Sequence, residues 1–122
     1  MTKMWIKVKL KKDRFSVRRG GTSKVLDVFC NTCGNLVLIY QKDGPGPLLR
    51  CYSDRIFYPK KYMVKDLGYI REMPKLVCSK CGTLIGMPMR YKKHTENRLA
   101  FKMIPASFKK KRSTNSVLIK QH

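Results

Sequence analysis

The sequence predicts a small, mostly β domain, a β-rich α+β fold, held together by one metal ion. Three observations lead to this prediction. The chain has 122 residues, which suits one domain with a modest core. Short stretches of β-branched and aromatic residues recur between turns that contain Gly and Pro. Four of the five cysteines form two Cys-x-x-Cys pairs, each followed by glycine, and a core this small gains stability from a metal.

Four strands are expected in the first half of the chain. The first alternates apolar residues with Lys, so that Ile6, Val8 and Leu10 share one buried face. The second leads into the first cysteine pair, and the third leads out of it. The Gly and Pro breakers over residues 43–47 should end the third strand. The expected strands span residues 5–11, 25–29, 36–40 and 48–52.

The second half of the chain is less regular. Residues 60–70 are ambiguous. Their apolar members could lie on one face of a short helix, although Gly68 lowers the helix propensity of the segment. Apolar residues 76–77 run into the second cysteine pair, and residues 84–85 run out of it. The segment Met87-Pro88-Met89 should interrupt regular structure. Residues 98–104 predict a last strand or a short helix.

The two cysteine pairs have the same form, Cys30-Asn31-Thr32-Cys33-Gly34 and Cys78-Ser79-Lys80-Cys81-Gly82. A two-residue spacing lets both sulfurs of one tight turn face a single point, and the glycine permits the positive φ that such a turn often needs. The glycine also leaves the backbone amides there free to hydrogen-bond the thiolates. Four thiolates suit one Zn²⁺ and leave no open position for water, so we expect a structural zinc. The predicted ligands are Cys30, Cys33, Cys78 and Cys81.

This strand–knuckle–strand arrangement resembles the zinc ribbon, a class common among ribosomal proteins, transcription factors and RNA polymerase subunits. The resemblance is at the level of the class and covers residues 28–40 and 76–91. Between Cys33 and Cys78 lie 44 residues, against the ~15–20 of the short pattern. The resemblance therefore implies a ribbon with a large insertion, with another four-cysteine zinc fold as the alternative. We expect one zinc-stabilised domain with a basic N-terminal segment over residues 1–108, and a basic flexible tail over residues 109–122.

Other uses of the cysteines stay open at this point. A single Cys-x-x-Cys is also a redox motif, and four thiolates also hold iron–sulfur clusters. Two structural disulfides would need an oxidising compartment, which the odd cysteine count disfavours. Cys51 is either an alternative ligand or nucleophile, or a buried small apolar residue, and the second interpretation is favoured.

The charge of the chain points to a polyanionic partner. Lys and Arg number 28 against 7 Asp and Glu, a formal net charge of +21. Residues 1–24, 25–89 and 90–122 carry net charges of +8, +4 and +9, so the two ends are the most basic parts. Self-repulsion of this size destabilises a compact state, and a nucleic acid would neutralise it.

Three basic segments are candidate nucleic-acid contacts. Arg18 and Arg19 precede two glycines, which would let the backbone approach phosphates. Lys60 and Lys61 lie among aromatic residues that either stack on unpaired bases or belong to the core. The third is the cationic run at the start of the expected tail. The candidate residues are Arg18, Arg19, Lys60, Lys61, Lys109, Lys110, Lys111 and Arg112.

These patterns predict a structural RNA-binding protein, ribosomal or ribosome-associated, with rRNA and neighbouring ribosomal proteins as its expected partners in a reducing cytoplasm. Catalysis is not expected, because neither histidine has an orienting partner in sequence and the acids are scattered singly. No stretch reaches the ~18 apolar residues that span a bilayer, so no membrane partner is expected. The alternatives are a DNA-binding or transcription-associated zinc ribbon, and a zinc module that binds a protein.

Overall fold

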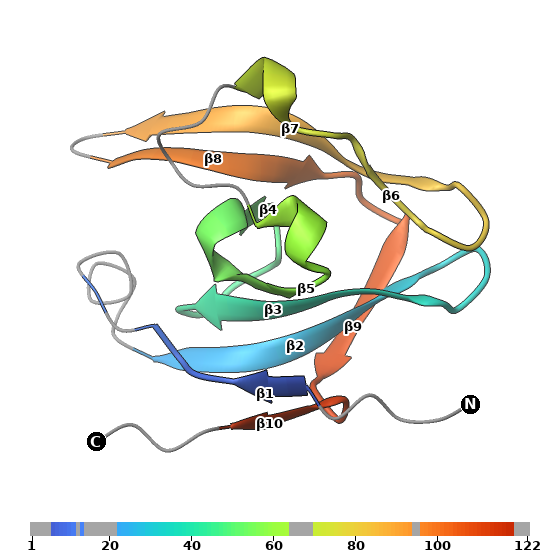
Figure 1. Cartoon of the computed structure of the whole chain (residues 1–122), viewed down its shortest axis with the longest axis horizontal. Helices are drawn as coiled ribbons and strands as arrows, with labels where there is room; N and C mark the ends of the chain where they lie inside the picture. Colours follow the sequence, from blue (N-terminus) through green and yellow to red (C-terminus); the bar gives the residue numbers. More distant parts are fainter. Residues whose placement is uncertain (1–5, 12, 14–21, 64–69, 94–95, 119–122) are drawn as a thin grey trace.

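The computed structural model describes residues 6–11, 13, 22–63, 70–93 and 96–118, and every structural statement here concerns these residues. Two four-stranded antiparallel sheets face each other, and a two-stranded parallel sheet lies beside one of them (Figure 1). The regular helical structure described consists of short 3-10 turns. The expectation of a small, mostly β fold is therefore confirmed.

The first sheet contains the strands that flank the first cysteine pair. Its order is β5 (Ile56–Tyr58), β3 (Leu36–Asp43), β2 (Ser23–Cys30) and β9 (Phe108–Arg112). The central hairpin β2–β3 pairs antiparallel from Ser23 opposite Asp43 to Phe29 opposite Leu36. β3 is longer than expected, because Gln41, Lys42 and Asp43 continue the ladder before the Gly and Pro breakers begin.

The second sheet contains the strands that flank the second cysteine pair. Its order is β4 (Arg50–Tyr52), β8 (Glu96–Met103), β7 (Leu84–Lys93) and β6 (Leu76–Val77). Residues 98–104, expected as a strand or a short helix, lie almost wholly in β8. The turns β2–β3 and β6–β7 meet at one end of the molecule, on the right of Figure 1.

The main core lies between the two sheets. One cluster of buried side chains draws members from both sheets, among them Leu38 and Ile56 on one side and Leu99 and Phe101 on the other. Tyr62 joins this cluster from the short turn η2 (Lys60–Tyr62), its ring edge-on to Phe101 at 5.5 Å. Two further 3-10 turns, η1 (Ser53–Arg55) and η3 (Ile70–Glu72), complete the connections. Of the residues considered for a helix, 60–62 form η2 and Ile70 begins η3, while residues 64–69 lie outside the described part.

The N-terminal strand packs on the far side of the first sheet. β1 (Ile6–Val8) pairs in parallel with β10 (Ser116–Leu118). Ile6, Val8 and Leu10 pack with Val25 and Ile39 in a second apolar cluster, while Lys7, Lys9 and Lys11 are exposed. The alternation expected over residues 6–11 is confirmed. The buried amide of Gln41 then fixes the chain by accepting from Lys11 N and donating to Lys11 O, both at 2.7 Å.

β7 continues through Met87-Pro88-Met89 to Lys93, so the expected interruption is wrong. Pro88 lies opposite Phe101 of β8. On the other side of β7, the ladder with β6 reaches only Leu76 opposite Gly86. Among the described residues, no strand pairs with β7 at Pro88 on that side. Proline has no backbone N–H to donate, and it is tolerated where a strand lies at the edge of a sheet.

The flexible tail expected from residue 109 is wrong for residues 109–118. Lys109 to Arg112 form most of β9, which pairs with β2 from Leu26 opposite Arg112 to Cys30 opposite Phe108. Asp27 of β2 is buried and holds the turn that follows β9. Its carboxylate accepts from Ser113 Oγ at 2.6 Å, Thr114 N at 2.9 Å and Asn115 Nδ2 at 2.9 Å. A buried carboxylate with several donors is a strong local anchor.

No helix in the described ranges is long and apolar enough to cross a membrane.

Replacing Asp27 should release the C-terminal strands. Asp27→Ala removes all three hydrogen bonds to residues 113–115 and should cost about 3 kcal/mol of unfolding free energy. Amide hydrogen exchange should accelerate over residues 108–118 more than in β7 and β8. Asp27→Asn keeps the shape of the side chain and should lie between wild type and Asp27→Ala. Unchanged exchange over residues 108–118 in the alanine variant would refute the anchoring role.

Candidate metal centre

The two cysteine pairs occupy the turns of the two hairpins that meet at one end of the fold (Figure 1). Cys30 is the last residue of β2, and Cys33 lies in the turn before β3. Cys78 follows β6 directly, and Cys81 precedes β7 by three residues. Each sheet therefore contributes one pair.

The two turns have the same backbone geometry. The amide of Gly34 donates to Cys30 O at 2.8 Å, and the amide of Gly82 donates to Cys78 O at 2.9 Å. The two glycines have φ angles of 80° and 79°. A Cβ atom at either position would meet no atom within 4 Å, so the left-handed backbone rather than crowding requires glycine there.

The four sulfur atoms lie together. All four Sγ atoms are within 4.8 Å of one another, and they could hold a metal ion. Across the two turns, Cys30 Sγ lies 3.6 Å from Cys81 Sγ, and Cys33 Sγ lies 3.5 Å from Cys78 Sγ. The edge of a tetrahedron with ~2.3 Å zinc–sulfur bonds is about 3.8 Å, so these separations suit one tetrahedral ion. All four cysteines are free thiols, Cys30 and Cys78 buried and the other two exposed.

Backbone amides favour thiolates at the first cysteine of each pair. Burial alone would raise the pKa of Cys30, but hydrogen bonds from the amides of Cys33 and Thr32 and contacts with neighbouring side chains lower the pKa to about 6. Burial opposes the thiolate of Cys78 as well, yet the amides of Cys81 and Lys80 lower its pKa. The amides that favour the thiolates thus belong to the residues within each turn, while the amide of the glycine bonds to a carbonyl.

The second cysteine of the first pair has the opposite pKa shift. The amide of Asn35 lowers the pKa of Cys33, but burial and the three neighbouring cysteines together raise it to about 11. Four clustered thiols resist carrying four negative charges, because like charges disfavour one another. A bound cation would remove that conflict, since metal ligation requires the thiolate form.

Side chains around the sulfurs connect the two turns. Asn35 Nδ2 donates to Cys78 Sγ at 3.8 Å and to Ser79 Oγ at 3.4 Å, so a residue after the first pair contacts the second pair. The Oγ1 atom of Thr83 lies 3.0 Å from Cys81 Sγ. Such outer hydrogen bonds orient metal ligands.

Cys51 lies away from this cluster. It is fully buried in the main core, within β4, and it is not one of the four clustered cysteines. Burial raises the pKa of the Cys51 thiol well above its ordinary value. The interpretation as a buried small apolar residue is confirmed.

The structure places the basic candidates differently from one another. Arg18 and Arg19 lie outside the described residues. Lys60 and Lys61 are exposed on η2, and Lys61 Nζ lies 5.1 Å from the ring centre of the buried Tyr62. The aromatic partner there belongs to the core and is not available to a base.

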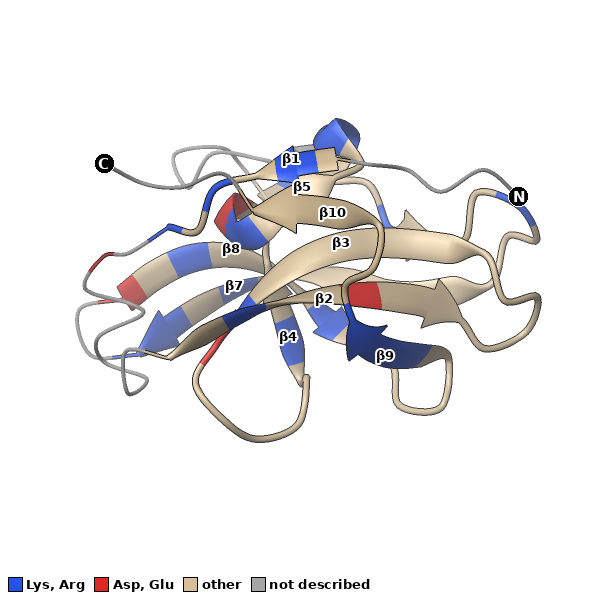
Figure 2. Cartoon of the chain, turned by 90° about the horizontal axis from the view of Figure 1, so that it is seen from below, with Lys and Arg blue, Asp and Glu red and all other residues tan. Residues whose placement is uncertain are grey.

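The cationic run from Lys109 to Arg112 is exposed along the length of β9 (Figure 2). Successive strand side chains point to opposite faces, so β9 presents cations on both sides of an outer strand of the first sheet. The backbone of this strand is fixed, because Cys30 pairs with Phe108 and Asn31 N donates to Ser107 O at 2.9 Å. The same contacts place β9 beside the first cysteine turn.

Sequence reasoning missed a buried ionic network. Arg55 and Arg98 are 1% and 0% exposed. Arg55 bonds to Asp13 at 2.6 Å, Asp43 at 2.9 Å and Asp54 at 3.3 Å, and Arg98 bonds to Asp54 at 2.8 Å. Burial would lower the pKa of Arg55, but the hydrogen bonds that it donates to the carboxylates of Asp13 and Asp43 raise it above the ordinary value. Nothing in the spacing of these five residues predicts that they meet.

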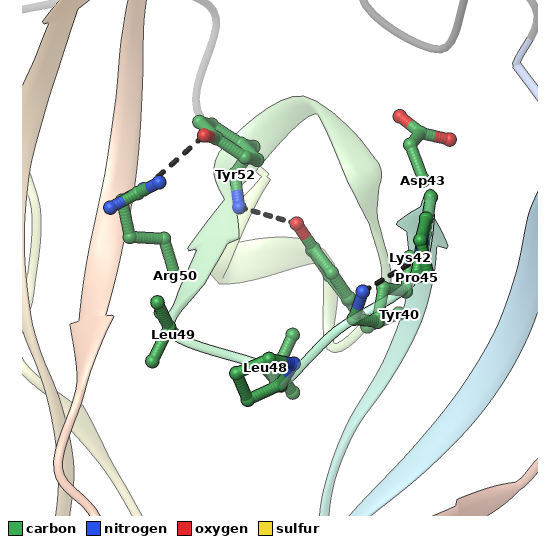
Figure 3. Close-up of a pocket in the computed structure, with 10 residues that line it drawn as sticks. Tyr40, Lys42, Asp43, Pro45, Leu48, Leu49, Arg50 and Tyr52 are labelled. Atoms are coloured by element: carbon green, nitrogen blue, oxygen red, sulfur yellow. Dashed lines mark hydrogen bonds between the residues drawn. The ribbon is translucent and has the colours of Figure 1, made fainter. Parts of the chain in front are cut away.

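A pocket of about 320 Å³ lies between the end of β3 and β4 (Figure 3). Its walls include Leu48, Leu49 and Arg50. Tyr40 and Tyr52 are joined in the pocket wall, because the amide of Tyr52 donates to the Tyr40 hydroxyl at 2.8 Å. Burial raises the pKa of Tyr40, which keeps this phenol neutral.

Comparison with protein families, with curated proteins and with solved structures found no match for this chain.

Single cysteine replacements should separate the four clustered residues from Cys51. Cys78→Ser should reduce bound metal from about one ion per chain to near zero, because serine is a poor ligand for such an ion. Cys51→Ala should keep the full metal content and lose about 1 kcal/mol of stability from its small cavity. Metal analysis of both purified proteins is the measurement. Loss of metal from Cys51→Ala would overturn the assignment.

Removing the metal should loosen the end of the fold where the two turns meet. Structural metal sites in small domains contribute on the order of 10 kcal/mol, which is comparable to the whole stability of a domain. After treatment with a strong chelator, amide NMR signals of residues 28–38 and 76–86 should collapse toward random-coil positions. Adding back the metal should restore them. Dispersed signals in the metal-free protein would contradict this expectation.

Proposed function

We propose that the protein is a zinc-stabilised RNA-binding protein in which the four-cysteine site is structural. Cys30, Cys33, Cys78 and Cys81 would all ligate the ion, as in a zinc ribbon, with no position left for a substrate. Thiolate-only sets with tetrahedral spacing favour zinc among the common metals, with iron as the competitor. The Lys and Arg side chains of the surface would contact phosphates.

One observation carries the RNA-binding proposal: five of the described acids make internal contacts or are buried, while most described cations face solvent. Asp27 holds the turn after β9, and Asp13, Asp43 and Asp54 bind Arg55. Glu96 is buried. These carboxylates therefore contribute little to neutralising the exposed lysines, and the surface keeps a strong positive potential.

The exposed cations are held on ordered strands and spread over several elements. Figure 2 shows Lys and Arg on β1, β4, β7, β8 and β9. Cations on several faces suit a protein enclosed by folded RNA better than a protein that presents one recognition helix to a duplex. We therefore place the proposed function in a ribonucleoprotein particle, with the ribosome as the proposed setting.

Sucrose-gradient fractionation of cells tests this setting. Co-migration with a ribosomal subunit that resists moderate salt would support it. Co-purification with polymerase or chromatin would contradict it and favour the DNA-binding alternative.

The cations of β9 should contribute a measurable share of the salt dependence of RNA binding. A variant that carries Thr at all four positions, 109 to 112, keeps a strand-forming residue at each of them. Each phosphate contact contributes about 0.7 to 0.9 to the slope of log affinity against log salt. If all four residues touch phosphates, the slope should therefore flatten by roughly 3 units. Fluorescence anisotropy with a labelled structured RNA across salt concentrations is the measurement.

A charge-preserving variant is the control for this experiment. Changing Lys109, Lys110 and Lys111 to Arg keeps every charge of the strand and should keep the slope. Parallel salt lines for the Thr variant and wild type would show that β9 makes no phosphate contacts.

A further inference from the structure

The second sheet has an outer face that the main core does not use. Cys51 of β4 and Phe101 of β8 lie opposite each other in the ladder and both belong to the core cluster. Because neighbours along a strand point to opposite faces, Arg50 and Tyr52 point away from the core. They share that outer face with Lys102 and Ala100 of β8, which lie opposite them in the ladder.

Aromatic rings and guanidinium groups are stacked on this face. The guanidinium carbon of Arg98 lies 3.8 Å from the ring centre of Tyr52. The rings of Tyr52 and Tyr91 meet edge-to-face at 5.7 Å. The guanidinium carbon of Arg50 lies 4.5 Å from the ring centre of Tyr91, and Arg50 Nε donates to the Tyr52 hydroxyl at 3.3 Å.

The inner half of this assembly is buried and the outer half reaches solvent. Arg98 is 0% exposed and Tyr52 is 7% exposed, whereas Arg50 and Tyr91 are half-buried. Met87, which lies opposite Lys102 on β7, is 40% exposed. The Arg50–Tyr91 pair is therefore a planar, solvent-accessible surface whose orientation is fixed by the buried residues behind it.

Exposed lysines lie beside this pair on the outer face. Lys102 is exposed and lies opposite Arg50 in the ladder, and Lys93, two residues after Tyr91 on the same face of β7, is exposed. The one acid in β4, β7 and β8 is Glu96, which is 4% exposed. A partner with planar apolar groups and a negative charge at each repeating unit would match both features.

We propose that this outer face binds an unpaired segment of RNA, with one base stacked on the Arg50–Tyr91 pair and adjoining phosphates at Lys102 and Lys93. Unpaired bases stack on aromatic rings and on guanidinium planes, and lysines track the backbone. A duplex keeps its bases stacked inside and offers no free base plane to this pair. The inference rests on the proposed function and adds where, and in which form, RNA is bound.

The pocket beside β4 shapes the edge of this surface. Arg50 and Tyr52 line both the pocket and the outer face, and Leu48 and Leu49 form an adjoining apolar wall (Figure 3). The surface next to the stacking pair is therefore concave. Ligand sites are typically concave and partly apolar, with a few polar groups that fix orientation.

Binding to a labelled, unpaired RNA decamer and to the same decamer with abasic sites tests the proposal. Wild type should bind the base-bearing strand roughly 5- to 150-fold more tightly than the abasic strand, the range expected for one stacked base. Arg50→Lys keeps the charge and loses the planar group, and Tyr91→Leu removes the ring. Both variants should lose that preference, while the salt slope of Arg50→Lys stays that of wild type.

Tyr91→Phe is the matched control, because it keeps the ring and should keep the preference. Metal content and thermal unfolding show whether each variant is still folded. If Tyr91→Leu is not folded, the surface variant Arg50→Lys alone tests the stacking site. Equal wild-type affinity for the two strands, or unchanged preference in Arg50→Lys and Tyr91→Leu, would overturn the stacking site. Tighter binding of a duplex than of the decamer would overturn it as well. If the stacking site is overturned but the salt slope still changes in the β9 variant, the proposed RNA-binding function holds and only this binding site is wrong.

Discussion

The convergence of two hairpin turns on four sulfur atoms is the constraint on which the rest of this structure depends. Each sheet ends in one cysteine turn, and the four Sγ atoms lie within 4.8 Å of one another. Cys30 and Cys78 also close one end of the core cluster that both sheets share. Strand β9 then pairs with β2 as far as Cys30. The cysteine cluster thereby links three features: the spacing of the two sheets, the end of the core and the position of the most cationic strand.

The placement of negative charge explains how a chain of net charge +21 stays folded. Four of its described acids, Asp13, Asp27, Asp43 and Asp54, bind buried arginines or hold a turn, as in the Arg55–Asp43 and Asp27–Ser113 contacts. Breaking a buried pair by removing one partner typically costs 3–5 kcal/mol. The interior is therefore locally balanced in charge, while the surface carries an excess of cations. Cohesion and the attraction for a polyanion thus come from different sets of residues.

The sequence predicted the cluster of four cysteines and the strands next to it because the relevant signals are local. A two-residue spacing and a glycine define each cysteine turn, and alternation identifies Ile6, Val8 and Leu10 as one face. It could not predict β9, since four consecutive cations show no alternation and pair with a strand about 80 residues earlier. The contact of Arg55 with Asp13, 42 positions apart, and the stacking of Arg50 on Tyr91 likewise depend on register between distant strands. Arg18 and Arg19 lie outside the described residues, so that prediction stays a prediction.

The pairing of β2 with β9, and of β1 with β10, has a consequence for the order of events during synthesis. Leu26 lies opposite Arg112, and Ile6 lies opposite Ser116. The sheet that carries the first cysteine turn therefore lacks an outer strand until about 80 further residues have left the ribosome. Ladders between such distant segments form slowly, because a long loop must close first. Until then the edge of β2 is an open template for pairing with other chains, which makes this edge the site where aggregation of the nascent protein would begin.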